Sequence, residues 1–243
     1  MPNSNLLTII FFSCLWRPCQ QQQHPDCIHR CGNIDIPYPF GIGPPEHGCY
    51  SDDNFAVSCN NSSRKPILQK FNLEILEVRS NPPYEYGQYG GVTVKIPSVS
   101  ACRGTTIHWN SPNLKGSPFN FGSPNIFASV GCHGYASFDD GRNRNIEGCT
   151  SICLDIQETN TSTLLELDQC YGYNSCCQID IPLAKKYSIS VSVNNASGHY
   201  CRSAFLISRE YLASHALSQS TVPSMAAVPV VLLWYIENLN EGT

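Results

Sequence analysis

Cysteine constrains the fold of this chain more than any other residue type, because 14 of its 243 residues are cysteine. Reducing compartments keep thiols free and use them sparingly, so this number, beside only two methionines, indicates an oxidising compartment and disulfide bonds. The spacings Cys27-x-x-x-Cys31 and Cys149-x-x-x-Cys153 differ from the C-x-x-C of a zinc knuckle, and the seven histidines are scattered. We therefore expect disulfides and no metal site.

The cysteines after residue 20 form an even set of twelve, which predicts six bridges. Cys176 and Cys177 should not pair with each other, because a bridge between chain neighbours strains the peptide and the sulfur geometry. The predicted bridges use Cys27, Cys31, Cys49, Cys59, Cys102, Cys132, Cys149, Cys153, Cys170, Cys176, Cys177 and Cys201.

The start of the chain also fits an oxidising compartment. Leu6–Trp16 is an apolar run of signal-peptide length and is too short to span a bilayer. We predict a signal peptide over residues 1–19; the alternative is a buried strand at the start of the fold. Removing these residues leaves the even set of twelve cysteines.

Charge and glycosylation signals point the same way. Charged residues make up only 14% of the chain, so attached glycan is a candidate source of its solubility. A net charge of −4 argues against a nucleic-acid partner but allows a local basic patch. The chain is predicted to be an extracellular glycoprotein. Its N-x-S/T acceptor sites are Asn60, Asn61, Asn160 and Asn195.

Short alternating or β-branched runs predict a mainly β fold. In one of them, Ile189, Val191 and Val193 should be buried on one face. The best of the few helix signals covers 208–217, with Ser208 as the N-cap. No apolar run is long enough for a membrane span. The fold class is therefore mainly β and disulfide-rich, with two packed Cys-rich β modules and one or two short helices. The predicted strands are 55–59, 73–79, 91–96, 126–130 and 187–193.

Ordered motifs along the chain resemble a plant protein family. Cys27-Ile-His-Arg-Cys-Gly32, Ile36-Pro-Tyr-Pro-Phe40 and Phe55-x-x-x-Cys59 are similar to the galacturonan-binding module of wall-associated receptor kinases. A second Cys-rich segment of that family is similar to Gly131-Cys132, Gly148-Cys-Thr-Ser-Ile-Cys153, Cys176-Cys-Gln178, Cys201-Arg-Ser-Ala-Phe205 and Val228-Pro-Val-Val-Leu232 with Trp234.

The resemblance implies a domain plan and a function. It implies a galacturonan-binding module over 27–106, a second Cys-rich module over 107–236 and a tail over 237–243. The implied function is binding of pectin, as oligogalacturonide or homogalacturonan, in the cell wall or apoplast. An acidic wall polysaccharide is then the partner, with a membrane receptor as a second candidate. No cofactor is implied, and calcium would enter only through the pectin.

This sequence departs from the family pattern in two ways. Leu233 stands where relatives usually have an acidic residue before the tryptophan. The EGF-like, membrane-spanning and kinase parts of full-length plasma-membrane relatives are not in this sequence, so we expect a truncated or soluble ectodomain.

A binder of an acidic polysaccharide needs cations, and loop tyrosines can stack on sugar rings. The alternative for each cation is an ordinary solvated charge, and for the tyrosines a lid over the core. Pro37 and Pro39 predict an extended segment at a sheet edge, with Tyr38 and Phe40 pointing to the same side. That pair is expected in the core, with sugar stacking as the alternative. The candidate ligand-binding residues are Arg30, Arg64, Lys65, Lys70, Arg79, Lys95, Arg103, Tyr84 and Tyr86.

Catalysis is not expected. A glycosidase needs two carboxyl groups about 5–10 Å apart on one site, whereas neighbours on a strand, as in Asp52-Asp53 or Asp139-Asp140, point to opposite faces. No Gly-x-Ser-x-Gly elbow is present. We predict no catalytic residue; a structural or inhibitor-like Cys-rich protein without sugar binding, and less so a glycosidase, are the alternatives.

The cysteine count also addresses the boundary between the modules. A first module ending near Cys102 contains five cysteines and leaves seven, both odd. Either one bridge crosses the boundary, or Cys132 belongs to the first module and the seam lies in the polar 139–145 loop. We expect the second arrangement.

Overall fold

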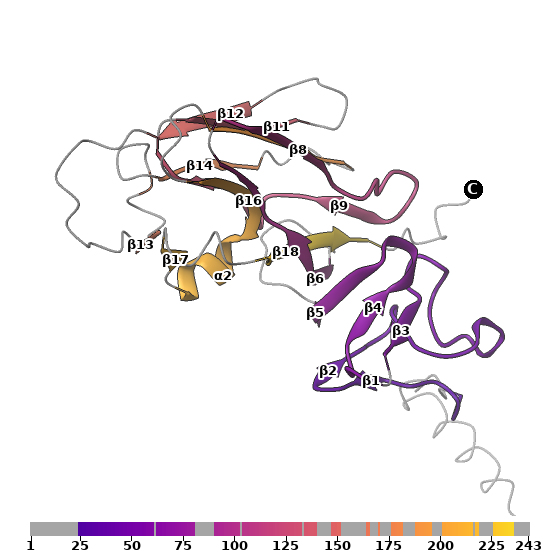
Figure 1. Cartoon of the computed structure of the whole chain (residues 1–243). Coiled ribbons are helices and arrows are strands. Elements are labelled where there is room, and N and C mark those ends of the chain that lie inside the picture. The colour runs from indigo at the N-terminus through magenta and orange to yellow at the C-terminus, as the bar shows by residue number, and fades with distance from the viewer. Residues whose placement is uncertain are drawn as a thin grey trace, which may run out of the picture.

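The computed structural model describes residues 24–60, 62–80, 90–102, 104–132, 134–139, 147–151, 164–165, 170, 176–181, 188–195, 201–215, 217–218 and 226–235. The protein is mainly β and disulfide-rich, as predicted (Figure 1). The predicted signal peptide, the 237–243 tail, and Asn61, Tyr84, Tyr86, Arg103, Cys153 and Asn160 lie outside the described residues.

A six-stranded antiparallel sheet contains both the N-terminal region and the C-terminal strand. Its order is β3 (Val57–Cys59), β4 (Pro66–Leu68), β5 (Leu73–Arg79), β6 (Gly90–Pro97), β18 (Ala227–Trp234) and β9 (Phe119–Phe121). Strand β18 pairs with β6 along its whole length, from Ala227 opposite Pro97 to Trp234 opposite Gly90. A strand from the end of the chain thus completes a sheet that begins at its start.

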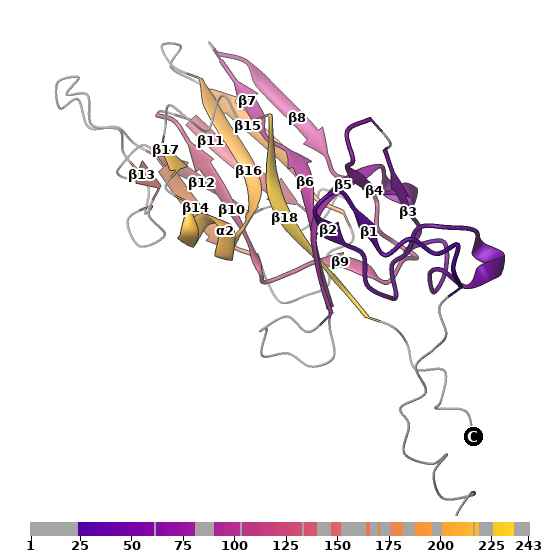
Figure 2. The same ribbon diagram turned by 90° about the horizontal axis from the view of Figure 1, so that it is seen from below.

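Eight further strands form a two-layer sandwich, seen at the upper left of Figure 1. Rings of Phe127 and Phe138 meet between the layers with centroids 4.9 Å apart. Ile189, Val191 and Val193 are buried, as predicted. In Figure 2, β16 lies beside β18, which brings the sandwich against the six-stranded sheet. One layer is β14 (Cys176–Asp180), β10 (Asn125–Val130), β16 (Arg202–Ser208), β7 (Val99–Ala101); the other is β12 (Glu147–Ser151), β11 (Gly134–Asp139), β15 (Ser190–Asn195), β8 (Thr106–Asn110).

The described residues also form short helices and pairs of two-residue strands. The predicted helix is present as α2 (Arg209–Ser214), and the side chain of Ser208 accepts a hydrogen bond from the Tyr211 backbone N–H. Two short 3-10 helices are η1 (Pro45–His47) and η2 (Gln69–Phe71). None of the helices among the described residues has the length and apolar character needed to cross a bilayer. Two-residue strands pair as β1 (Arg30–Cys31) with β2 (Ile34–Asp35), and β13 (Leu164–Leu165) with β17 (Leu217–Ser218).

The disulfides confirm one expectation. Cys176 pairs with Cys170 and Cys177 with Cys149, so the two neighbours are not bonded to each other. The Cys149–Cys177 bridge joins β12 to β14, one strand from each layer of the sandwich. The other described bridges are Cys27–Cys49, Cys31–Cys59 and Cys102–Cys201, and Cys132 is also disulfide-bonded.

The expected seam in the 139–145 loop is wrong. Strands β11 and β12, on either side of this loop, pair with each other in an antiparallel hairpin. Cys102 is bonded to Cys201 across the expected module boundary, which is the first of the two arrangements considered. Both a hairpin connection and a boundary between modules are polar and lack an apolar pattern. Polarity alone therefore could not distinguish the two.

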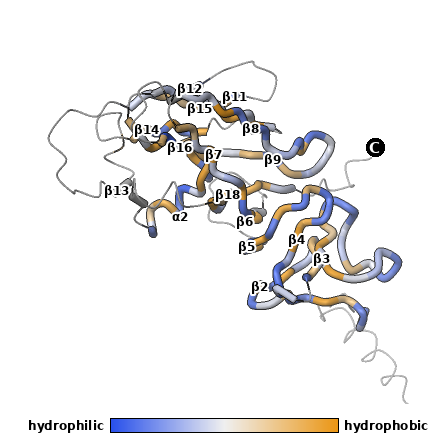
Figure 3. The backbone as a smooth tube through the Cα atoms, in the orientation of Figure 1, coloured by the Kyte–Doolittle hydropathy of each residue, from blue (hydrophilic) through white to orange (hydrophobic). Residues whose placement is uncertain are grey.

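One continuous hydrophobic core runs through both sheet systems. Figure 3 shows hydrophobic and hydrophilic stretches alternating along the backbone of both sheet systems. Phe40 and Phe55 pack edge-on against Trp234, with ring centroids 5.7 and 5.8 Å apart. The Trp234 ring lies flat over Gly90, where an added Cβ would come within 2.0 Å of it. The N-terminal signature motif and the closing strand therefore share one aromatic cluster.

The expectation that Tyr38 and Phe40 point to the same side is wrong. Phe40 is 1% exposed, whereas Tyr38 is 43% exposed. The Phe40 N–H donates to the Pro37 carbonyl at 3.0 Å, so these residues form a turn and the two-residue alternation of a strand does not apply. The segment lies against the edge strand β3, as predicted, because the Val57 N–H donates to the Gly41 carbonyl at 2.9 Å.

Arg202 is a fully buried cation at the start of β16, with 0% exposure. Its Nη1 donates to the Gly131 carbonyl at 2.9 Å and to the Ser151 hydroxyl at 2.8 Å. Burial lowers the pKa of Arg202 to about 10, which still leaves it charged at neutral pH. Among the described residues, no carboxylate pairs with it. A Cβ at Gly131 would lie 2.8 Å from the Arg202 Cα, so this arginine requires the glycine beside it.

Candidate functional site

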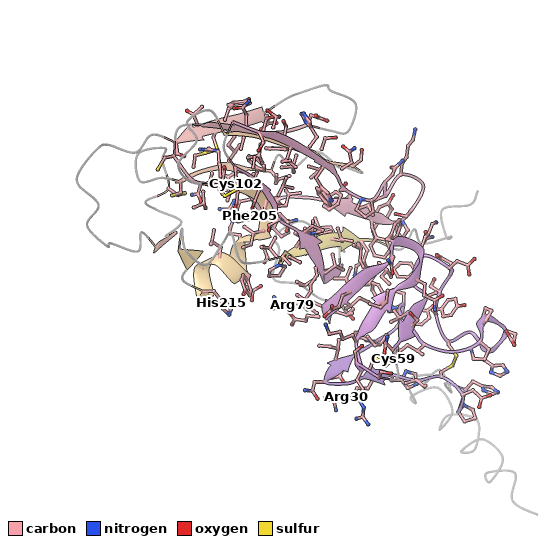
Figure 4. The ribbon with its side chains drawn as sticks, viewed as in Figure 1. Arg30, Cys59, Arg79, Cys102, Phe205 and His215 are labelled. Atoms are coloured by element: carbon pink, nitrogen blue, oxygen red, sulfur yellow. A yellow bond between two sulfur atoms is a disulfide. The ribbon has the colours of Figure 1, made fainter. Side chains whose placement is uncertain are left out.

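The six described cations of the predicted binding set do not form one cluster. Arg30 lies on β1, and Arg79 lies at the far end of β5, next to α2 (Figure 4). Arg79 is also distant from Glu74, which lies near the start of β5, because five residues along a strand span about 17 Å at roughly 3.4 Å per residue. Only Lys65 and Lys95 converge on one point, the side chain of Glu74.

Strand alternation explains why the Glu74 and Lys95 side chains meet. Glu74 lies between buried Leu73 and Ile75, and Lys95 lies between buried Val94 and Ile96. In each strand the apolar neighbours take the core face, so the charged residue takes the outer face.

The two lysines share one carboxylate. Lys65 Nζ lies 3.2 Å from Glu74 Oε2, and Lys95 Nζ lies 2.7 Å from Glu74 Oε1. Burial raises the pKa of Glu74, but hydrogen bonds and charge from Lys95 and Lys65 outweigh it and hold the pKa below its usual value. At neutral pH these three side chains therefore carry a net charge of +1.

Arg64 adds a further charge beside Lys65. The turn that holds it is fixed by Asn60, whose carbonyl accepts the Arg64 N–H at 2.7 Å and whose N–H donates to the Lys65 carbonyl at 3.1 Å. Arg64 adopts a positive φ of 51°. Among the described residues, its guanidinium has no ion-pair partner. We call Arg64, Lys65 and Lys95, with Glu74 between the lysines, the cationic patch.

The other predicted cations are engaged elsewhere. Arg30 Nε lies 3.2 Å from Asp35 Oδ1, its cross-strand partner. Lys70 Nζ donates to the Asn54 side-chain oxygen at 2.6 Å.

Arg79 binds Glu210 of α2 through two nitrogens, at 2.5 and 3.1 Å, and also binds Glu77. Hydrogen bonds that Arg79 donates to Glu210 and then to Glu77 raise the pKa of Arg79, and the contact with Arg79 lowers the pKa of Glu210. This cation therefore joins β5 to α2 and is already paired with two carboxylates.

Sequence reasoning missed Glu74 as the centre of the patch and also missed a second surface on the sandwich. Four exposed side chains lie in register across the outer layer: Thr150 opposite Tyr135, Tyr135 opposite Asn194, and Asn194 opposite Thr106. The Asn194 side-chain amide donates to the Thr106 hydroxyl at 3.0 Å. We call these four the uncharged row. The alternation that identified Val191 and Val193 as core also implied the outward polar set.

Of the paired carboxylates considered for catalysis, Asp52 has a structural contact. Its Oδ1 accepts the Asn54 backbone N–H at 2.7 Å and the Asn54 side-chain amide at 2.6 Å, which closes a turn. Asp139 is buried on β11, and Asp140 lies outside the described residues.

Fold and surface together define a disulfide-rich β protein with a small exposed cationic patch, a type of construction typical of oxidising, extracellular compartments. The chain belongs to the wall-associated receptor kinase family. Residues 23–82 match the family described as wall-associated receptor kinase galacturonan-binding, and residues 167–242 match the family described as wall-associated kinase. Neither match is to a catalytic domain.

Individual relatives extend over most of the chain. It is 32% identical to wall-associated receptor kinase-like 5 of Arabidopsis thaliana over 223 residues, which is 86% of this chain and 29% of that protein. Wall-associated receptor kinase-like 4 and 1 of the same plant are each 31% identical and cover 87% and 88% of this chain. The chain spans 28–30% of the length of these relatives. No solved structure matches it.

Proposed function

We propose that this protein acts outside the cell, in the cell wall or apoplast, where it binds de-esterified pectin without catalysis. The cationic patch carries this proposal, because Lys65 and Lys95 share only one carboxylate and Arg64 has no described ion-pair partner. Galacturonan presents a row of carboxylates, so cations on an exposed strand face suit it. The match of residues 23–82 to a galacturonan-binding family supports the same reading.

The expected strength of such a surface is modest. One exposed ion pair contributes about 0.2–1 kcal/mol, whereas micromolar affinity requires about 8 kcal/mol. Recognition therefore needs polar contacts in addition to the three cations, or many chains acting on one polymer. Binding by this surface requires no cofactor, although calcium can arrive with the pectin. A membrane receptor as a second partner stays a prediction.

Two triple variants test the surface with equal changes in formal charge. Arg64, Lys65 and Lys95 are replaced by Ala in one, and Arg30, Lys70 and Arg79 in the other. Removing three exposed contacts at about 0.2–1 kcal/mol each should weaken binding of oligogalacturonide roughly threefold to a hundredfold. The control triple should change it less, because Arg30 and Arg79 already pair with carboxylates and Lys70 with an amide.

Calorimetry at low and high salt measures both effects. Binding should fall as salt rises, since the Debye length shrinks from about 8 Å at physiological ionic strength to about 3 Å at 1 M. Equal affinity for fully methyl-esterified pectin, or equal losses in both triple variants, would contradict a charge-based site. Shortened oligomers after long incubation would instead indicate a glycosidase. No binding to any galacturonide would favour a structural or inhibitor-like role.

A further inference from the structure

A second group of side chains gathers at the N-terminal end of the described chain, away from the cationic patch. His24, Asp26 and His47 each contribute one ligand atom, and these atoms all lie within 4.8 Å of one another. His24 Nδ1 is 3.4 Å from Asp26 Oδ2, and His47 Nδ1 is 3.3 Å from the same oxygen. Two imidazole nitrogens therefore converge on one carboxylate oxygen.

Hydrogen bonding does not account for this convergence. His47 Nδ1 is buried and has no hydrogen-bond partner, although the carboxylate oxygen is close. Buried polar atoms normally have a hydrogen-bond partner, so the lack of one at His47 Nδ1 needs an explanation. The Asp26 backbone N–H donates to His24 Nδ1 at 3.4 Å, and a metal ion at that nitrogen would displace this long hydrogen bond, because the nitrogen has one lone pair.

The two nitrogen–oxygen distances agree with those in a coordination sphere. Zinc binds imidazole nitrogen and carboxylate oxygen at about 2.0–2.2 Å in tetrahedral geometry. Two ligands at such distances on a tetrahedral ion are about 3.3–3.4 Å apart, which agrees with both nitrogen–oxygen distances here.

Covalent and local contacts hold the three residues in place. The Cys27–Cys49 disulfide, with Cα atoms 5.2 Å apart, links the segment of His24 and Asp26 to that of His47. The Cys27 N–H donates to the His24 carbonyl at 2.9 Å. The two imidazole rings stack with centroids 3.7 Å apart, so their in-plane lone pairs run nearly parallel and a ring must turn for both nitrogens to bind one ion.

We propose that His24, Asp26 and His47 form a three-ligand site for a divalent transition-metal ion such as Zn²⁺, with its remaining position open to solvent. All three side chains are partly exposed, which leaves room for a water or an outside ligand. Imidazole nitrogen suits zinc, copper and nickel, whereas calcium takes oxygen ligands. The site therefore differs in chemistry from any calcium carried by pectin. Sequence reasoning missed it because the cysteines, and not the histidines, drew the search for metal ligands.

Calorimetric titration of the chelator-stripped secreted protein with ZnCl₂, free of any histidine tag, tests the proposal. We expect one ion bound per chain. His47→Ala and Asp26→Asn should each weaken zinc binding by more than the roughly 10- to 100-fold cost of losing an outer-shell partner. His108→Ala, an exposed histidine on β8, should bind as the unaltered protein does.

Folding is checked separately, so that a loss of zinc binding can be distinguished from misfolding of the variant. Circular dichroism and a free-thiol count should be unchanged in every variant, and Asp26→Asn preserves shape if His47→Ala disturbs the disulfide. No zinc binding by the unaltered protein would overturn the proposal. So would binding by folded Asp26→Asn or His47→Ala at the original affinity, or binding of CaCl₂ at this site as tightly as ZnCl₂.

Discussion

The six-stranded sheet and the sandwich place their charges in opposite ways. On the outer face of β4–β6, Lys65 and Lys95 project beside Glu74, over a core of Leu73, Val94 and their neighbours. The outer layer of the sandwich has the same two-residue alternation, but its uncharged row is polar without charge. Alternation decides which side chains face outward; the residue types then decide what that face can attract.

The sandwich instead keeps a cation inside. Arg202 is fully buried, and its Nη1 donates to the Gly131 carbonyl and the Ser151 hydroxyl. A charge in that position cannot attract a polymer, but it can hold strands together. Lys65 and Lys95 of the N-terminal region thus lie at the surface, while Arg202 of the sandwich is enclosed by its strands.

The largest expected effect tests whether the buried cation of the sandwich stabilises the fold. Arg202→Ala should lower the free energy of unfolding by about 3–5 kcal/mol, because it leaves a cavity and removes one donor from the Gly131 carbonyl and one from the Ser151 hydroxyl. Arg209→Ala, an exposed arginine that pairs with Asp180, should cost about 1 kcal/mol or less. Denaturant unfolding with disulfides intact measures both. Similar values for the two variants would show that the buried cation is not structural.

The next effect tests whether the exposed cationic patch binds the polymer. Glu74→Gln removes the carboxylate shared by Lys65 and Lys95, so oligogalacturonide affinity should rise, by up to about fivefold for a change of about 1 kcal/mol. Glu77→Gln, on the same strand but beside Arg79, should leave the affinity unchanged. Calorimetry at low salt suits this comparison. A fall in affinity with Glu74→Gln would place recognition elsewhere.

A smaller effect should appear in the pH dependence of stability. The pKa of Glu74 is lowered in the folded protein, so its contribution is present above the unfolded value, about 4.3, and is lost as pH falls through the folded value. Glu74→Gln should therefore be less stable than the unaltered protein at pH 7, by about 1 kcal/mol or less. This difference should shrink toward zero near pH 3. A difference independent of pH between 7 and 3 would argue against the ion pairs.

The smallest expected effect concerns the uncharged row. Tyr135→Ala together with Asn194→Ala should leave oligogalacturonide affinity within about twofold, because neither residue carries charge toward the polymer. Chain folding is confirmed by circular dichroism. A large loss of binding would transfer the acidic-polymer site from the cationic patch to the sandwich.

Local sequence patterns gave a good account of the elements. The strand 73–79 has the predicted bounds, and 126–130 differs by one residue. Ser208 caps the helix as expected, although the helix ends at Ser214, earlier than predicted. Such features depend on residues a few positions apart, through side-chain alternation and backbone capping, so they can be read from the chain directly. Cysteine number and chain-neighbour geometry likewise predicted that Cys176 and Cys177 take different partners.

The sequence by itself therefore determined the β class, the presence of disulfide bonds and the residues on the inner faces of the strands. Only the tertiary structure decided that β18 completes the N-terminal sheet, that Cys102 pairs with Cys201, and that Glu74 gathers Lys65 and Lys95 while Arg79 leaves them for α2. It also brought His24 and Asp26 to His47. These pairings join segments far apart in the chain, and their free energy depends on the packing of the whole core, which no local pattern records.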